Sequence, residues 1–407
     1  MLAGHTLCVE SLLGAGGQPA HSDGAGRSSV HLACARGRAS VLRQLLDHSP
    51  SACDALAAGL SPLHLAAAGD HVECIDLLIS TIERVGGSGK DGGGGGRAGG
   101  DDDVKGGSKL GAAIDAAAVG ELTPLHLAAA QGALSALNAL LAAGADATTA
   151  GQRSKKRPLH TACEHGRGAA VGLLLASGAN AKADANAPDT HGSTPLHWAC
   201  KAGCRDAVSV LLRAGAQPDA RTSSLSTPLH LACEAGSAAC ASLLLRASAS
   251  ATAADSNGVT PMHAASAVGS LACVELLLAA EGGEKEGGVE GGGEGGGEGV
   301  AAAGMAAANA LMCFEGKHDL SGLSETYTKG PLYLASEKGH AEVVSRLLRA
   351  GADVHALATI ETAQSSTKTS AVWAAKRAGH GAVVAVLEAA GGQEAAETVE
   401  KEAGQVV

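Results

Sequence analysis

The chain has 407 residues, a length that suits two or three ordinary globular domains. Only 1% of the residues are aromatic, so a core must be built mainly from Leu, Val and Ala, which favours thin helical layers. The formal net charge of -11 is concentrated in residues 281–298 and 391–407, and the remaining residues carry about -3. This balance excludes the broad basic surface expected of a nucleic-acid-binding protein.

A four-residue motif, Ser/Thr-Pro-Leu-His in its best form, recurs along the chain. Copies begin at residues 28, 61, 123, 157, 194, 227, 260, 330 and 370. The histidines at 31 and 64, and those at 197, 230 and 263, are 33 residues apart. A fixed period of this size indicates one supersecondary unit stacked on itself.

The unit at residues 189–220 shows what each repeat should form. Residues 189–192 predict a turn, after which Thr194 is the expected N-cap of a helix and Pro195 its first residue. This helix should end near Gly203, and a second helix with one apolar face should follow and end at Gly215. Both helices are too short to persist alone, so packing against neighbouring repeats must stabilise them.

These features resemble the ankyrin-repeat family, and the resemblance covers most of the chain outside two insertions. It implies an all-α repeat solenoid in which pairs of helices are joined by β-hairpin-like turns. It also implies that the motif histidine is a structural clip between neighbouring turns. The residues with this expected structural role are Thr194, Pro195, His197, His126, His160, His230 and His263.

The resemblance further implies that partner proteins bind to hairpin tips and to the exposed face of each first helix, which form the concave side. The matching positions are Thr190, His191, Ser193, Lys201, Ser256, Asn257, Val259, Glu164, His165, Glu234, Glu337 and Lys338, with Ala202, Ala235, Ala267, Val268, Arg377 and Ala378 at equivalent places. Most of the tip residues are small and polar, which predicts either modest affinity or affinity distributed over many repeats. We expect Trp198 to pack between layers.

The organisation of the chain follows from the motif positions. Residues 1–17 resemble the second half of a repeat, which predicts either a truncated chain or a frayed end. Repeats are then expected at 28–85, 120–280 and 328–390, the last repeat being a divergent cap. The intervening segments are two Gly-rich insertions predicted to be disordered, 86–111 and 281–304, a decayed repeat or linker at 305–327, and an acidic tail at 391–407. At both insertions, either a loop was inserted or a repeat decayed.

Catalytic and metal-binding chemistry finds little support. Gly86–Lys90 lacks the flanking Gly and Ser/Thr of a phosphate-binding loop. His-x-x-Cys recurs at the motif, but a zinc ion needs four converging ligands, and neighbouring repeats should lie about 10 Å apart. We therefore expect no enzyme activity, no metal and no cofactor. The motif cysteines at 34, 163, 200 and 233 should be buried thiols.

The sequence thus predicts a monomeric, non-enzymatic scaffold or adaptor that binds other proteins. The free cysteines and the absence of a long apolar run favour the cytosol or the nucleus, without a membrane span. The basic run Arg153–Arg157 is either a solvated turn, a weak nuclear-import signal or a contact for an acidic partner. The alternative function is the regulatory or substrate-recruiting part of a larger enzyme, ubiquitin ligase or channel. No accessory box is visible after residue 390, which counts against a ligase adaptor.

Overall fold

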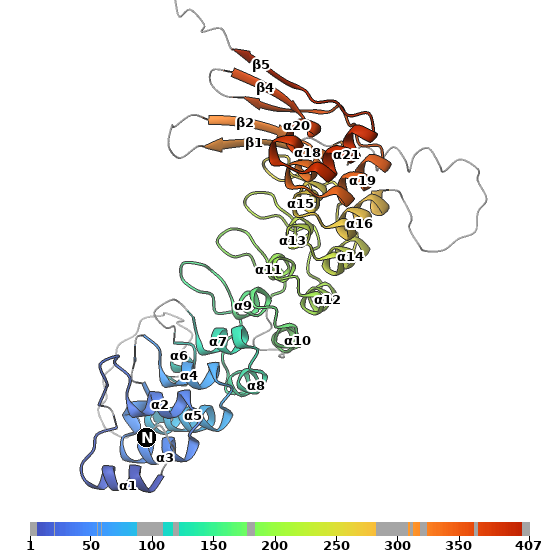
Figure 1. Cartoon of the computed structure of the whole chain (residues 1–407). Helices are drawn as coiled ribbons and strands as arrows, with labels where there is room; N and C mark the ends of the chain where they lie inside the picture. Colours follow the sequence, from blue (N-terminus) through green and yellow to red (C-terminus); the bar gives the residue numbers. More distant parts are fainter. Residues whose placement is uncertain are drawn as a thin grey trace, which may run out of the picture. The chain divides into compact units, whose positions relative to one another are not determined.

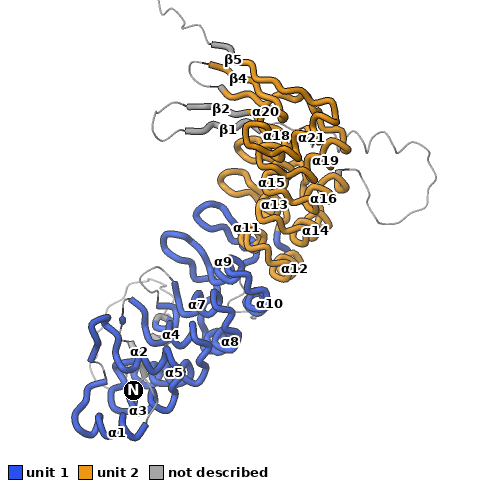
Figure 2. Tube along the Cα trace, viewed as in Figure 1, with its two compact units in different colours: residues 1–195, 213–216 blue, residues 196–212, 217–407 orange. Residues whose placement is uncertain are grey.

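The computed structural model contains two compact units (Figure 2), residues 1–195 with 213–216 and residues 196–212 with 217–407. It describes residues 6–19, 21–54, 56–57, 59–87, 109–116, 122–176, 184–281, 308–309, 312–317, 324–361 and 365–400. None of the helices in this part of the chain is long and apolar enough to cross a membrane.

The first unit is a stack of helix pairs (Figure 1). Its first helices are α2 (Ser29–Ala35), α4 (Pro62–Ala68), α7 (Pro124–Gln131) and α9 (Pro158–Glu164). Its second helices are α3 (Ala39–His48), α5 (Val72–Gly87), α8 (Leu134–Ala142) and α10 (Gly168–Ala176). Three further elements are α1 (Thr6–Gly14), which packs on α3 as the second half of a repeat should, a 3-10 helix (Pro50–Asp54) and α6 (Lys109–Ile114).

The second unit repeats this arrangement. Its first helices are α11 (Pro195–Lys201), α13 (Pro228–Glu234), α15 (Pro261–Val268), α18 (Pro331–Lys338) and α20 (Ala371–Ala378). Its second helices are α12 (Arg205–Arg213), α14 (Ala238–Arg246), α16 (Leu271–Glu281), α19 (Ala341–Arg349) and α21 (Gly381–Ala389). The described part of this unit also contains five strands: β1 (Met312–Lys317), β2 (Ser324–Lys329), β3 (Leu357–Glu361), β4 (Ser365–Ser370) and β5 (Ala396–Glu400).

The motif residues explain where each first helix begins. Thr123 adopts an extended conformation as the N-cap of α7, its hydroxyl accepts from the backbone N–H of His126, and Pro124 occupies the first turn. The helix ends at Gly132, whose φ of 73° is the left-handed conformation that glycine adopts readily. The core between the helix layers consists of small apolar residues such as Leu125, Ala128 and Leu137, all buried.

The two insertions leave the stacking of helices within each unit intact. First helix α4 packs directly on α7, and α15 packs directly on α18. Because these first helices are in direct contact, no complete helix pair lies between α4 and α7 or between α15 and α18. α5 ends at Gly87 and α6 begins at Lys109, so both ends of the segment 86–111 are helical, which corrects the predicted boundaries. Residues 88–108 and 282–304 lie outside the described residues.

The second unit contains an antiparallel sheet that the sequence pattern does not predict, with the strand order β1-β2-β3-β4-β5. The described part of the segment 305–327 contains β1 and the start of β2, which makes the interpretation as a decayed helical repeat wrong. β5 lies in the acidic tail 391–407 and pairs with β4, from Ser365↔Glu400 to Thr369↔Ala396. The hairpins that precede α18 and α20 are thus extended into a sheet.

Candidate partner-binding surface

The motif histidines lie in the interior and connect neighbouring repeats. The Nδ1 atom of His126 accepts the backbone N–H of Thr123 at 3.2 Å, which places the ring proton on Nε2. Nε2 then donates to the Lys156 carbonyl, 3.0 Å away, in the next hairpin. The same forward hydrogen bond is made by His31, His64, His160, His197 and His230 to the carbonyls of Leu60, Leu122, Ala187, Ser226 and Val259, at 2.9 to 3.2 Å. At His263, Nδ1 likewise accepts from the Thr260 N–H.

Burial favours the neutral form of four of these imidazoles. Desolvation lowers the pKa of His64, His126 and His230, although the backbone carbonyl beside each ring opposes the shift. The pKa of His160 falls to about 4, mainly because the ring is desolvated. A neutral ring can accept at Nδ1 while it donates at Nε2, whereas the imidazolium could only donate. The motif histidines are thus suited to hold hairpins together and poorly suited to proton transfer.

The predicted partner-binding residues lie outside this interior. Thr190, His191, Lys201, Ser256, His165, Glu234 and Lys338 are exposed, and Ser193, Asn257, Val259, Glu164 and Glu337 are half-buried. Two of the half-buried carboxylates are already paired: Glu164 lies 2.8 Å from Lys156 Nζ, and Glu337 lies 2.9 Å from Lys329 Nζ. Thr190 is also occupied, because its N–H and its hydroxyl both donate to the Ser154 carbonyl.

Aspartate side chains shape two of the tips. Asp189 Oδ1 accepts the backbone N–H groups of His191 and Ser193, at 2.8 and 2.9 Å. Asp255 makes the equivalent pair of hydrogen bonds to Asn257 and Val259. An Asp two residues before the tip residue is a typical turn-forming signal, so the sequence does contain this information.

Two repeats place a large side chain where other repeats have a left-handed glycine. The residue two positions before the N-cap is Gly192 or Gly258 in well-formed repeats, with φ of 75° and 73°. The same position is Lys155 in one repeat and Leu225 in another, with φ of 51° and 61°. Leu225 is 43% exposed, and its turn is fixed by the bond from its N–H to the Thr222 carbonyl. A strained, exposed side chain at a tip is typical of a functional position.

Three aromatic residues of the second unit have a cation over the ring. Lys201 Nζ lies 5.2 Å from the ring centroid of the half-buried Trp198, so this ring packs in the helix layer with one side covered by a cation. The guanidinium of Arg377 lies 5.0 Å from Trp373, and Lys329 Nζ lies 5.3 Å from Tyr333. These distances are within the range of a cation–π interaction.

No catalytic or metal-binding set emerges among the residues that the structure describes. They contain no group of three or more His, Cys, Asp or Glu side chains able to hold a metal ion. The motif cysteines at 34, 163, 200 and 233 are buried and unbridged. Desolvation raises the pKa of the Cys34 thiol well above its ordinary value, which makes this thiol a poor nucleophile.

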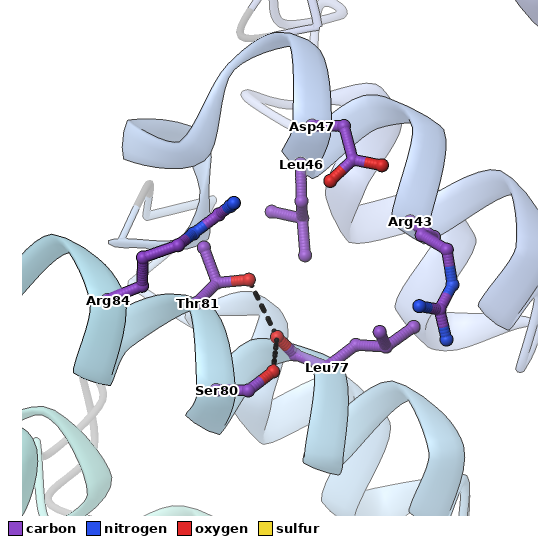
Figure 3. Close-up of a pocket in the computed structure, with 7 residues that line it drawn as sticks. All are labelled: Arg43, Leu46, Asp47, Leu77, Ser80, Thr81 and Arg84. Carbon is purple, nitrogen blue, oxygen red and sulfur yellow. Dashed lines mark hydrogen bonds between the residues drawn. The ribbon is translucent and has the colours of Figure 1, made fainter.

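A hollow of about 230 Å³ lies between second helices α3 and α5 (Figure 3). Its lining consists of Arg43, Leu46, Asp47, Leu77, Ser80, Thr81 and Arg84. The hydroxyls of Ser80 and Thr81 both donate to the Leu77 carbonyl, at 3.0 and 2.7 Å. No imidazole or thiol lines the hollow to activate them, so it offers no nucleophile–base pair.

Comparisons with known proteins agree with this architecture. A model described as "Ankyrin repeats (3 copies)" matches residues 1–85, 125–222 and 217–286, and one described as "Ankyrin repeat" matches residues 330–358. The chain is similar to Ankyrin repeat and SOCS box protein 18 of Homo sapiens, with 35% identity over 91 residues. That match covers 22% of this chain and only 19% of the relative's length.

The chain is also similar to a solved structure, the crystal structure of the human ASB11 ankyrin repeat domain. The sequence identity is 25% and the TM-score is 0.49, with coverage of 65% of this chain and 100% of that chain. The family models alone match more than half of this chain. Together with the capped helix pairs and the histidine hydrogen bonds, the family-model matches establish that the chain belongs to the ankyrin-repeat family.

Proposed function

We propose that this chain is a non-enzymatic scaffold or adaptor that binds partner proteins through its hairpin tips and the exposed ends of its first helices. The supporting observation is a division of roles within the repeats that carry the full motif. The motif Ser or Thr and the His are buried and hydrogen-bonded, whereas helix-end residues such as Lys201 and Glu234 are exposed. The ankyrin-repeat family typically mediates protein–protein interaction and is typically non-catalytic. Function in such a fold depends on the residues on its surface.

The test compares two exposed surfaces of the same chain. One variant combines His191→Ala, Lys201→Glu and Glu234→Lys at tips and first-helix ends. The matched control combines Arg246→Glu and Glu275→Lys, which change exposed charges on second helices α14 and α16. Each full-length variant is affinity-purified from cells, and recovered proteins are quantified by mass spectrometry.

We expect the first variant to lose partners that the wild type and the second-helix control both recover. The far-UV circular dichroism of all three proteins should be the same, because exposed substitutions change stability by only about 0.5 kcal/mol. Equal partner recovery by the two variants would exclude this surface as the binding site.

A second candidate is the substrate-recruiting part of a ubiquitin ligase, with other enzymes or a channel as less specific alternatives. The observation that favours a ligase is the name of one relative, which combines ankyrin repeats with a SOCS box. Ubiquitin transfer by the complex purified with this chain, measured on its recovered partners, distinguishes the two candidates. A ligase component should show such transfer, and a plain scaffold should not.

A further inference from the structure

Aromatic residues are concentrated near one end of the chain. It contains one Phe, two Tyr and two Trp, and all of these except Trp198 lie between residues 314 and 373. Aromatic residues and Arg are enriched among the residues that contribute most to protein binding. In a chain so poor in aromatic residues, this concentration singles out the C-terminal repeats of the second unit.

Two of these aromatic residues replace the motif histidine. Tyr333 is buried, and its hydroxyl lies 3.1 Å from the Thr369 hydroxyl in the next hairpin, so Tyr333 connects two repeats as a histidine would. Trp373 occupies the same position one repeat later and packs against the buried cluster of Tyr333, Ala358 and Ala374. Trp373 is only half-buried, and Arg377 stacks on its ring.

Charges at the ends of α18 and α20 are incompletely neutralised. Lys329 is paired with Glu337 at 2.9 Å, and Lys376 is paired with Glu388 and Glu394 at 3.2 and 3.0 Å. By contrast, Lys338 and Arg377 are exposed and form no ion pair with any described residue. α18 and α20 pack on each other, so these two cations stand at the ends of neighbouring helices.

Acidic residues near the end of the chain already lie beside basic residues of this region. Glu394, which precedes β5, reaches Lys376. In the sheet, Glu397 of β5 stands directly opposite Lys368 of β4. An extended acidic segment therefore lies against the basic residues of the last repeat on one side, while Lys338 and Arg377 remain available.

We propose that the exposed ends of α18 and α20, with Arg377 stacked on Trp373 and Lys338 on the neighbouring helix, bind an acidic segment of a partner protein. The guanidinium carbon of Arg377 lies 5.0 Å from the centroid of the Trp373 ring, and the planar guanidinium fork suits bidentate contact with a carboxylate. This inference rests on the proposed function and adds the location and the chemistry of one partner contact.

The experiment uses a phage-displayed library of random short peptides, selected on the immobilised full-length chain. Enriched peptides are synthesised with a fluorescent label and titrated by anisotropy against the wild type and three variants. Arg377→Glu reverses the proposed contact, Arg377→Lys keeps its charge without the planar fork, and Arg349→Glu makes the same charge change on second helix α19. A thermal melt of each variant verifies its folding.

The proposal predicts enriched peptides that are rich in Asp and Glu and whose affinity falls as ionic strength rises. Arg377→Glu should weaken their binding about tenfold or more, Arg377→Lys should weaken it less, and Arg349→Glu should leave it unchanged. Failure to enrich acidic peptides, or acidic peptides that bind Arg377→Glu as well as the wild type, would overturn it.

Titration of the same peptides against the triple variant His191→Ala, Lys201→Glu and Glu234→Lys separates this inference from the proposed function. Peptides that ignore Arg377 but are lost with His191→Ala, Lys201→Glu and Glu234→Lys would remove the acidic site while they support a binding surface at the tips. Peptides that bind both sets of variants as well as the wild type would contradict both proposals.

Discussion

The repeats between residues 123 and 263 differ from those that begin at 330 and 370 in the residue that connects one hairpin to the next. In the former, a buried imidazole forms hydrogen bonds at both ring nitrogens, as His126 does with Thr123 and Lys156. In the latter, Tyr333 makes one side-chain hydrogen bond and Trp373 packs against a small cluster. The imidazole lies entirely within the stack, whereas the larger ring of Trp373 leaves a surface for other contacts. Under the two proposals, connection and recognition use separate residues in the first region and share Trp373 in the second.

Acidification should separate the two regions most strongly. Burial lowers the pKa of folded His160 to about 4 from 6.5, and it also lowers the pKa of His64, His126 and His230. The unfolded chain therefore binds these protons more readily. The stability that these neutral histidines contribute is fully present above pH 6.5. It falls as the pH approaches 4, by up to about 1.4 kcal/mol per pH unit for each such histidine.

Fluorescence of the two tryptophans can follow this loss region by region. Trp198 in a Trp373→Phe variant reports on the histidine-containing repeats, and Trp373 in a Trp198→Phe variant reports on the last repeat. We expect the Trp198 signal to change at a higher pH than the Trp373 signal. The opposite order would show that the imidazoles do not control the acid sensitivity.

The His126→Ala substitution tests the two-sided imidazole bond directly. It leaves the Thr123 N–H without its acceptor in the interior and removes one of two donors to the Lys156 carbonyl, which keeps the Gly151 N–H, so unfolding free energy should fall by about 2–4 kcal/mol. Urea unfolding measured by circular dichroism reports this change. The exposed His191→Ala variant is the control, with an expected change within about 0.5 kcal/mol. Similar losses for both variants would refute the structural role of the motif histidine.

The Tyr333→Phe substitution should have a smaller effect, because only the bond to the Thr369 hydroxyl is lost. The expected cost is about 1 kcal/mol in urea unfolding. Combination with Thr369→Val in a double-mutant cycle shows whether the two hydroxyls act on each other. Fully additive losses would mean that this hydrogen bond contributes nothing.

The Leu225→Gly substitution should produce the smallest change, and it should be stabilising. Glycine relieves the left-handed backbone at φ of 61°, partly offset by its own entropy, for a net gain of about 0.5–1 kcal/mol. Ser223→Gly in the same tip lacks this strain and should not stabilise the chain. A loss of stability in Leu225→Gly would show that the side chain is kept for packing and not for contacts outside the fold.

The helix pairs are predictable from the sequence because their signals are local and repeated. Thr123 and Pro124 define the start of α7, Gly132 defines its end, and the period of 33 residues indicates stacking. The sheet is not predictable in the same way. β4 reads Ser-Ser-Thr-Lys-Thr-Ser, without alternation of apolar and polar residues, and its partners β3 and β5 are chosen by tertiary context.

The candidate site divides along the same line. Exposure of Lys201, Glu234 and Lys338 follows from their place in the repeat, and the family pattern suffices to predict it. The pairing of Glu337 with Lys329 depends on the path of β2, and the stack of Arg377 on Trp373 depends on a ring that departs from the motif. Positions can thus be read from a periodic sequence, whereas ion pairs between irregular segments require coordinates.

Amide hydrogen exchange of the wild type and of His126→Ala tests the central claim most directly, namely that neighbouring helix pairs hold one another folded. His126 lies in α7 and is hydrogen-bonded to the Lys156 carbonyl in the hairpin that leads into α9, and the two helices pack together. The substitution should therefore reduce amide protection in both α7 and α9, with less change at distant repeats. Loss of protection confined to α7, with α9 unaffected, would contradict the account.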